Sequence, residues 1–228
     1  MGKVVFNVVL PTKTKMFCGC PVLYDSEGYR LDSYSSTCPV CRREKGAYPI
    51  LNKKAVEEAI AVVLAFKGTV TQYTLFDRVR DESGLYDYIS QYSYPIGKDG
   101  CVEIAVEEPD SAEQTKYIDV PVLRLKEAEE EKGIPVLEIL SGPMEEEQNP
   151  YYIEEVEKVL LALGMEEWEI IETDQVIETI ETQKPVSYLP DPDIPPVIIS
   201  QWWVNQIAAR YPELIHIDEP EVDEEDDF

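Results

Sequence analysis

The chain has a single histidine and lacks both phosphate-loop motifs and long apolar runs. His216 has no cysteine, serine or second histidine near it in sequence, so a Ser-His-Asp or Cys-His hydrolase is not indicated. Neither G-x-x-x-x-G-K-[ST] nor G-x-G-x-x-G occurs, which excludes the usual glycine-rich phosphate cradles. No stretch reaches the roughly 20 uncharged apolar residues of a membrane span, and the start has no cleavage-site pattern. We therefore expect a cytoplasmic protein without membrane association.

Basic residues are scarce: 20 Lys and Arg oppose 46 Asp and Glu, which gives a formal net charge of −26. Such a field repels phosphate backbones, so we expect a basic protein partner rather than direct tRNA or DNA binding. Residues 217–228 are predicted to be a disordered acidic tail. Its candidate partner contacts are Asp223, Glu224, Glu225, Asp226 and Asp227. The alternative is that the acidic surface serves only solubility or a salt-rich cytoplasm.

The composition otherwise suits a folded domain, because 228 residues with 44% apolar content can bury a substantial core. One helix is predicted between Asn52 and Gly68, a second between Asn149 and Gly164, and a third after Ser200 over residues 201–210. Strands are predicted at residues 4–10, 86–92, 102–106, 117–125, 135–140, 168–171 and 176–180. The proline-rich residues 188–196 are predicted to form an extended linker without regular hydrogen bonding.

Four of the five cysteines form two close pairs, Cys18-Gly-Cys20 and Cys38-Pro-Val-Cys41. Zinc accepts four thiolates tetrahedrally, and each pair supplies two sulfurs to one side of the ion. We therefore predict a structural zinc held by Cys18, Cys20, Cys38 and Cys41. Because protein fills all four positions, the ion has no place for water or substrate and is not a hydrolytic centre. The alternative is two disulfides or four unrelated core cysteines, which a reducing compartment disfavours.

Two adjacent tryptophans, Trp202 and Trp203, lie in the predicted helix 201–210. Large aromatic side chains anchor many protein interfaces, which makes both residues candidate partner contacts. Aromatic residues on a short amphipathic helix also pack against their own domain, so this alternative stays open.

Six segments, in this order along the chain, resemble the B subunit (GatB) of aspartyl/glutamyl-tRNA(Asn/Gln) amidotransferase. They are TKTKMFCGC (12–20), STCPVCRREKGAYPILNKKAVEEAI (36–60), FDR (76–78), ISQYSYPIGKDGCVEI (89–104), GIPVLEILSGP (133–143) and SYLPDPDIPPVIIS (187–200). The resemblance implies an α+β cradle domain related to glutamine synthetase, with a mixed, largely antiparallel sheet, a few packed helices and a zinc-clipped loop. It predicts a cradle domain over residues 1–200 with the clip at 18–41, a terminal helix at 201–216 and then the tail.

The resemblance also implies an activity, the phosphorylation by ATP and Mg²⁺ of the side-chain carboxyl of misacylated Glu-tRNA or Asp-tRNA. The family strand E-V-H-V-E-L corresponds to residues 5–10, where Val5, Asn7 and Val9 replace the three polar groups. The family strand I-H-L-E-E-D-A-G-K is best matched by residues 123–128, which keep one carboxylate, Glu127, and introduce two cations, Arg124 and Lys126. Cations repel a divalent metal ion, so binding of Mg²⁺ and ATP is not expected.

Two hypotheses of different classes follow. The first is a non-catalytic relative, a pseudoenzyme stabilised by zinc that acts as a binding or regulatory module toward a basic protein partner. Its charge and shortened segments would suit a virus-borne protein that mimics nucleic acid in a host cytoplasm. The alternative is a functional component of a tRNA-dependent amidotransferase, acting on Glu-tRNA(Gln) or Asp-tRNA(Asn) in translation. In that case other subunits supply the missing ligands, and Glu127, Glu129 and Glu130 converge on one pocket.

Overall fold

The computed structural model of the protein describes residues 2–12, 14–22, 25–27, 38–42, 44–80, 87–106, 114–128, 133–173 and 187–215. The strand predicted at 176–180, the tail predicted at 217–228, and the residues His216, Glu129 and Glu130 lie outside the described residues. Within the described ranges, no helix has the length and apolar character that crossing a membrane requires.

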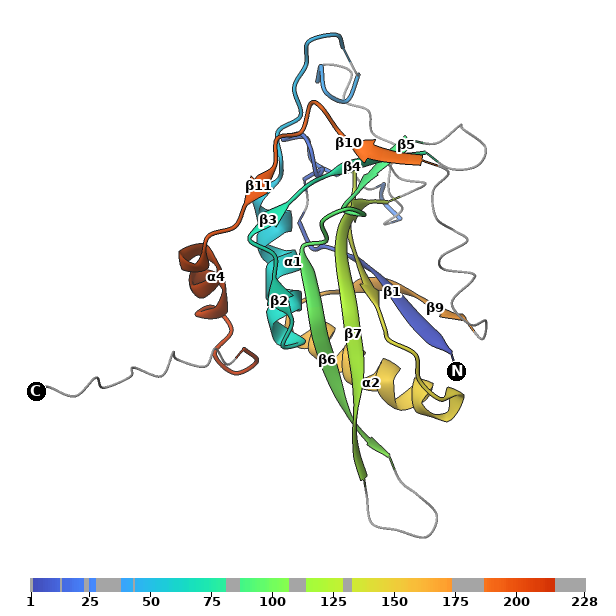
Figure 1. Ribbon diagram of the computed structural model, residues 1–228. Coiled ribbons are helices and arrows are strands. Elements are labelled where there is room, and N and C mark those ends of the chain that lie inside the picture. The colour runs from blue at the N-terminus through green and yellow to red at the C-terminus, as the bar shows by residue number, and fades with distance from the viewer. Residues whose placement is uncertain are drawn as a thin grey trace, which may run out of the picture.

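The body of the fold is a six-stranded sheet in the order β2-β6-β7-β8-β1-β9, in which every neighbouring pair is antiparallel (Figure 1). Its strands are β1 (Lys3–Val9), β2 (Thr69–Val70), β6 (Gly97–Val106), β7 (Gln114–Glu127), β8 (Pro135–Leu140) and β9 (Glu167–Thr173). The first strand lies between β8 and β9, and this central position explains its valine-rich sequence. The strands expected from the sequence in these regions are confirmed, although β6, β7 and β9 are longer than predicted, and the short strand β2 was not predicted.

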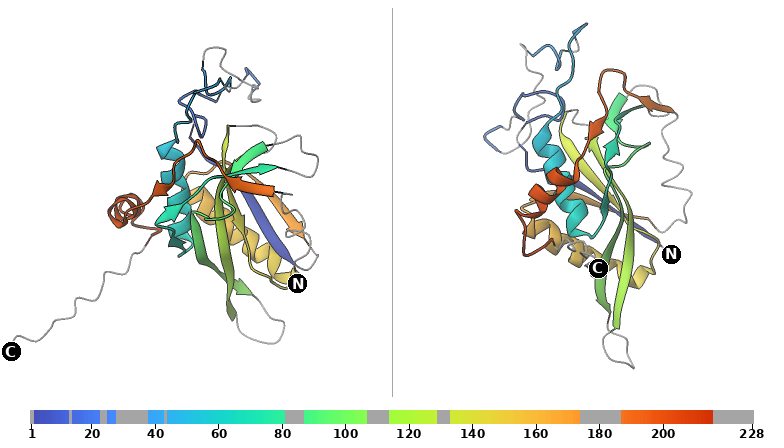
Figure 2. Two further views of the ribbon diagram at one scale, coloured as in Figure 1. Left: turned by 45° about the horizontal axis from the view of Figure 1, so that its top comes forward. Right: turned by 60° about the vertical axis from the view of Figure 1, so that its left-hand side comes forward.

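Helices α1 (Lys53–Ala65) and α2 (Asn149–Ala162) cover the same face of this sheet, as the two views of Figure 2 show. The first begins where predicted, because the Asn52 side-chain oxygen accepts hydrogen bonds from the backbone N–H groups of Lys54 and Ala55. The second differs from the prediction by one position. Asn149 lies inside the helix after the short 3-10 turn η1 (Glu146–Gln148), and its side chain donates to Glu172 at 3.0 Å.

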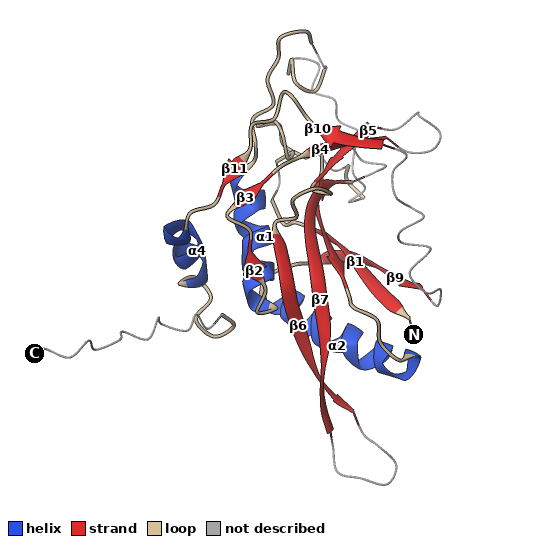
Figure 3. Ribbon diagram, viewed as in Figure 1, coloured by secondary structure: helices blue, strands red, loops and turns tan. Residues whose placement is uncertain are grey.

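Two small sheets and a third helix complete the described part of the chain. The sheets are β10-β4-β5, formed by β4 (Asp77–Arg80), β5 (Asp87–Ser90) and β10 (Ser187–Pro190), and β11-β3, formed by β3 (Tyr73–Thr74) and β11 (Val197–Ile198). Helix α4 (Gln201–Ala208) begins at Ser200, as predicted, and lies beside α1 (Figure 3). The described residues thus confirm an α+β fold with a largely antiparallel sheet and three α-helices.

The prediction that residues 188–196 lack regular hydrogen bonds is wrong. Strand β10 pairs with β4, and the backbone N–H of Asp191 donates to the carbonyl of Phe76 at 2.9 Å. Pro190 is compatible with this pairing because β10 is an edge strand of its sheet, where a missing N–H donor leaves no central ladder bond unmade. The segment is therefore part of the folded body.

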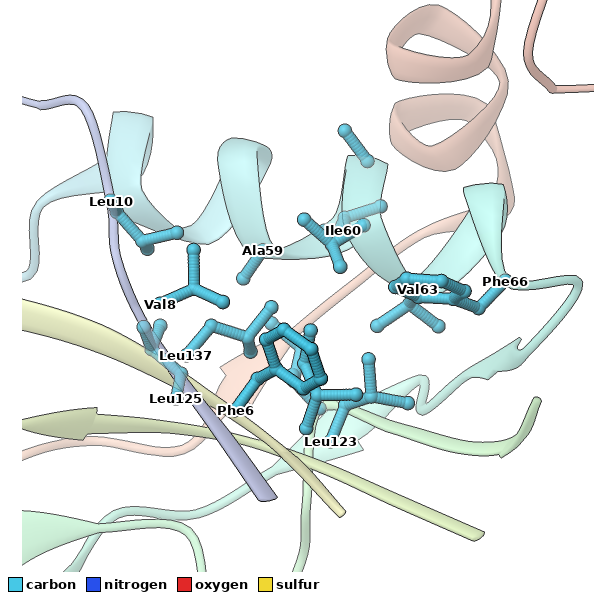
Figure 4. Close-up of a cluster of buried hydrophobic side chains, with 14 of the residues drawn as sticks. Phe6, Val8, Leu10, Ala59, Ile60, Val63, Phe66, Leu123, Leu125 and Leu137 are labelled. Atoms are coloured by element: carbon cyan, nitrogen blue, oxygen red, sulfur yellow. The ribbon is translucent and has the colours of Figure 1, made fainter. Parts of the chain in front are cut away.

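The core lies between the sheet and its two helices. Figure 4 shows Phe6 and Val8 of β1 pointing toward Ala59 and Ile60 of α1, and all four side chains are fully buried. The approach is close enough that a Cβ atom on Gly97 of β6 would lie 2.3 Å from a methyl group of Val63. A glycine at this position lets α1 pack directly on the sheet.

Candidate functional site

The four clustered cysteines converge in the structure. Their sulfur atoms all lie within 4.8 Å of one another, and the Sγ atoms of Cys18 and Cys41 are 3.6 Å apart. Four thiolates at about 2.3 Å from one tetrahedral zinc ion lie roughly 3.8 Å from each other. The four cysteines are therefore close enough to bind one metal ion, and the sulfur donor set is compatible with zinc.

The described chain around the cysteines, residues 14–22, 38–42 and 44–50, is called the cysteine clip below. The clip contains little regular secondary structure, and backbone hydrogen bonds connect it to the rest of the fold. Met16 donates to the Gly133 carbonyl at 2.7 Å, and Ile50 donates to the Phe17 carbonyl at 2.9 Å. The buried Phe17 ring also packs edge to face against the Phe76 ring, with 5.2 Å between the ring centres. These contacts place the four thiols at the end of the molecule near α1.

The surroundings shift the pKa values of three of these thiols in different directions. A hydrogen bond from the backbone N–H of Cys41 lowers the pKa of Cys38 to about 7. Burial raises the pKa of Cys18, and desolvation likewise raises the pKa of Cys20. Because a metal binds thiolates, binding would release protons from the latter two thiols at neutral pH. The Lys15 ammonium lies 3.8 Å from the Cys41 sulfur and donates a hydrogen bond to it.

A cavity of about 550 Å³ lies beside the cysteine clip. Its size falls in the range of small-molecule sites in proteins. Its lining includes Lys15, Cys18, Cys41, Arg78, Glu127 and Asp191. Asp191 is buried, and its carboxylate accepts bonds of 2.9 and 2.7 Å from Nε and one terminal nitrogen of Arg78. The cavity thus has a fixed ion pair on one wall and two clip cysteines on another.

The sheet face opposite α1 and α2 is called the far face below. It carries the positions at which the chain departs from the GatB motifs, which are Val5, Asn7, Val9, Arg124 and Lys126. Side chains alternate along a strand, and Phe6 and Leu125 point into the core. The strand register then places Glu138 of β8 directly opposite both Arg124 of β7 and Asn7 of β1.

Both introduced cations are paired with Glu138. Arg124 donates to one carboxylate oxygen at 2.7 Å, and the Lys126 ammonium lies 3.7 Å from the other. The three side chains are between 9% and 18% exposed, so the network is largely shielded from water. A metal ion at Glu138 would be repelled by both of these cations. Sequence reasoning missed Glu138, although it is the one charged residue in the apolar run PVLEIL.

The two candidate partner tryptophans lie in different surroundings. Trp202 is 71% exposed on α4. The Trp203 indole N–H donates to Glu57 of α1 at 3.0 Å, and the Lys53 ammonium lies 5.1 Å from the centre of its ring. Arg210 also bonds Glu57 at 2.8 Å. Trp203 therefore holds α4 against α1, and Trp202 is left at the surface. The five predicted acidic contacts, Asp223 to Asp227, lie outside the described residues.

Comparison with known proteins gives matches over most of the chain. The B subunit of aspartyl/glutamyl-tRNA(Asn/Gln) amidotransferase from Agathobacter rectalis is 26% identical over 296 aligned positions, covering 91% of this chain and 60% of the relative. The subunit from Carboxydothermus hydrogenoformans is 25% identical over 300 positions with the same coverage. That from Methanosarcina mazei is 42% identical over 104 positions, covering 42% of this chain and 19% of the relative.

The first two alignments run over more positions than the 228 residues of this chain, so those relatives carry inserted segments that this chain lacks. This agrees with the shortened segments that the sequence indicates. The chain spans about 60% of the length of these relatives. The family model of the GatB/GatE catalytic domain matches residues 6–173, from β1 to the last residue of β9. The chain therefore belongs to the GatB/GatE catalytic domain family.

Proposed function

We propose that this protein is a component of a tRNA-dependent amidotransferase that converts Glu-tRNA(Gln) or Asp-tRNA(Asn) to the amide form in the cytoplasm. The observation that carries this proposal is the extent of the family match. Residues 6–173 include five of the six strands of the central sheet in full, residues 6–9 of β1, and both covering helices. The relatives that match are named as B subunits of this amidotransferase.

Within this function, the cysteine clip holds a structural zinc ion through Cys18, Cys20, Cys38 and Cys41. Four thiolates complete the coordination of zinc, so the ion supplies rigidity and no open position for a reacting group. Two of these cysteines line the cavity beside the clip. The zinc would therefore fix the wall of that cavity and leave the chemistry to other groups.

Activation of a carboxyl group by phosphoryl transfer relies on carboxylates that hold Mg²⁺ against the phosphates. On the far face, Glu138 is already bound by Arg124 and Lys126, and Val5 and Val9 offer no oxygen. We infer that this chain does not hold Mg²⁺ and ATP on its own far face. Another subunit would supply those ligands, while this chain contributes the cradle that receives the substrate.

A second candidate function is a non-catalytic module for a basic protein partner. It is favoured by the net charge of −26 together with the cations that occupy the far face. Such a module would bind its partner in a manner that rising salt weakens, because screening reduces the attraction between opposite charges.

Reconstitution tests the two candidates. The chain would be combined with the remaining subunits of a bacterial amidotransferase whose own B subunit has been removed, and the conversion of Glu-tRNA(Gln) to Gln-tRNA(Gln) followed. Amide formation that depends on the added chain is expected. A chain that joins no amidotransferase subunit, and binds a basic protein with salt-sensitive affinity, would replace the first proposal with the second.

A further inference from the structure

Three side chains form a continuous stack at the junction of the central sheet and the small sheet β10-β4-β5. The Arg124 guanidinium lies 4.9 Å from the centre of the Tyr92 ring. The Tyr188 ring stacks on Tyr92 with 5.6 Å between centres and 25° between planes. The hydroxyl groups of Tyr92 and Tyr88 are 3.1 Å apart, which fixes the middle ring in its plane. The stack therefore joins residues that are up to 96 positions apart in sequence, from Tyr92 to Tyr188.

The stack is braced at both ends by the fold. At one end, the 2.7 Å bond to Glu138 holds Arg124 on the far face. At the other end, Tyr188 is held on β10 opposite the fully buried Val79 of β4. Rings positioned in this way lose little conformational freedom when another flat group is added, and preorganisation of this kind favours binding.

The outermost ring is open to solvent. Tyr188 is 44% exposed, whereas Tyr88 is 8% exposed. An exposed aromatic ring backed by a second ring and a cation is the arrangement on which single-stranded nucleic acids stack their bases, because every base offers a flat π surface. The exposed end of the stack therefore fits a nucleobase.

Positive charge is present on the same part of the molecule despite the acidic composition. Arg80 and Arg78 of β4 lie in register with Ser187 and Leu189 and are exposed. Because side chains alternate along a strand, they lie on the opposite face of this small sheet from Tyr188, and Arg78 is paired with Asp191. Residues 1–60 contain nine Lys and Arg against six Asp and Glu, so the negative charge of the chain is carried by residues 61–228. Two lysines of this portion, Lys15 and Lys45, line the cavity beside the cysteine clip together with Arg78. Four acidic residues also line it, so the charge there is mixed rather than uniformly negative; they are Glu44, Glu127, Asp191 and Asp193. The repulsion expected from net charge alone is therefore reduced here.

We propose that the exposed ring of Tyr188 is a stacking platform for a nucleobase at the single-stranded end of an RNA, with Tyr92 and Arg124 as the positioning residues behind it. The proposal rests on the amidotransferase function only for the identity of the RNA, the 3′ end of a tRNA. It departs from the expectation that the chain avoids nucleic acid, because it concerns one local site rather than the whole charged surface.

The experiment is a titration of the trinucleotide CCA, as RNA, into the full chain, with binding followed by calorimetry at low salt. The variant Tyr188→Ala is expected to weaken binding about 5- to 150-fold, the range that loss of one base–aromatic stack gives. Tyr188→Trp keeps a ring and is expected to retain binding. Tyr117→Ala is the matched control, because Tyr117 is 62% exposed on β7 and takes no part in the stack. Equal binding by Tyr188→Ala and wild type, or no binding by wild type, would overturn the proposal.

The positioning role of Tyr92 has its own variants. Tyr92→Leu removes the ring behind Tyr188 and is expected to weaken CCA binding while the Tyr188 ring remains present. Tyr92→Phe keeps the ring, loses only the 3.1 Å contact to Tyr88, and is expected to stay within about threefold of wild type, since the net contribution of one neutral hydrogen bond is small. Equal losses in both variants would show that packing, and not stacking, sets the affinity. Thermal melting of each variant checks that it is folded.

Failure of this proposal and failure of the amidotransferase function give different results. If CCA binding requires Tyr188 but the chain supports no amide formation in the reconstituted complex, the stacking proposal is supported and the amidotransferase function is contradicted. If the Tyr188→Ala variant supports amide formation as well as the wild type does, the amidotransferase function is supported and the stacking proposal is contradicted.

Discussion

Arg124 of β7 and Glu138 of β8 occupy directly opposed positions on the far face, and a hydrogen bond of 2.7 Å joins their side chains. Lys126 approaches the second oxygen of the same carboxylate at 3.7 Å. The Glu138 carboxylate, which could otherwise ligate a metal ion, is therefore paired with two cations of the protein itself. The two cations by which β7 departs from the family motif therefore share one carboxylate, and Asn7 of β1 lies opposite the same residue in the strand register.

Glu138→Gln is expected to destabilise the protein by about 1–3 kcal/mol. The change leaves two mostly shielded cations without this carboxylate, and uncompensated charge in a poorly solvated site is costly. The free energy of unfolding would be measured by urea denaturation. Glu154→Gln is the matched control, since Glu154 pairs with Lys158 on the exposed side of α2 and such pairs contribute under about 1 kcal/mol. Equal effects of the two changes would contradict the importance of the network.

We expect the packing of α4 on α1 to depend on pH, because Trp203 of α4 is hydrogen-bonded to the Glu57 carboxylate of α1. Burial raises the pKa of Glu57, but hydrogen bonds from Arg210 and Trp203 outweigh it and lower the pKa overall. Because the folded pKa lies below the unfolded value of about 4.3, the stabilisation is present above that value and is lost as the pH falls through the folded pKa. Trp203 fluorescence, followed in a variant with Trp168 and Trp202 replaced by Phe, is expected to change below about pH 4.3.

The control for this titration is Glu57→Gln in the same background. The amide keeps an oxygen that can accept from the indole but has no charge to lose, so the change in Trp203 fluorescence over the same acidic range should disappear. A transition of equal size in both proteins would assign the pH dependence to another group.

Removal of single cysteines tests the metal centre. Cys38→Ser and Cys41→Ser are expected to abolish the tight binding of one zinc per chain, because a structural site needs all four thiolates. Cys101→Ser is the control, since Cys101 lies in β6 and is not part of the cluster. Zinc content after purification under reducing conditions would be measured by mass spectrometry of the metal. Zinc that persists in Cys38→Ser would contradict the site.

The packing of α1 on β6 gives a prediction about stability. Gly97→Ala places a methyl group 2.3 and 2.7 Å from the two side-chain methyls of Val63, and overpacking of this kind costs about 1–3 kcal/mol. The double variant Gly97→Ala, Val63→Ala relieves the contact and should be more stable than the sum of the two single changes predicts. Additive effects in urea denaturation would show that the helix moves away instead.

Much of the fold could be predicted because its signals are local. The cap at Asn52 and the apolar stripe that follows it define α1, and the run PVLEIL defines β8. Strand β10 could not be predicted, since its partner β4 lies more than 100 residues earlier and its own prolines indicate a linker. The cysteine spacing predicts the cluster, whereas the pairing of Glu138 with two cations depends on strand register, which no local pattern specifies.

The central claim is that this family member does not hold Mg²⁺ and ATP on its own, because the far face is closed by the pairs of Arg124 and Lys126 with Glu138. Calorimetric titration of Mg²⁺–ATP into the isolated zinc-loaded chain tests it most directly. The account predicts no saturable heat at millimolar nucleotide. Saturable binding of one nucleotide per chain that requires Mg²⁺ and is lost in Glu138→Gln would contradict it.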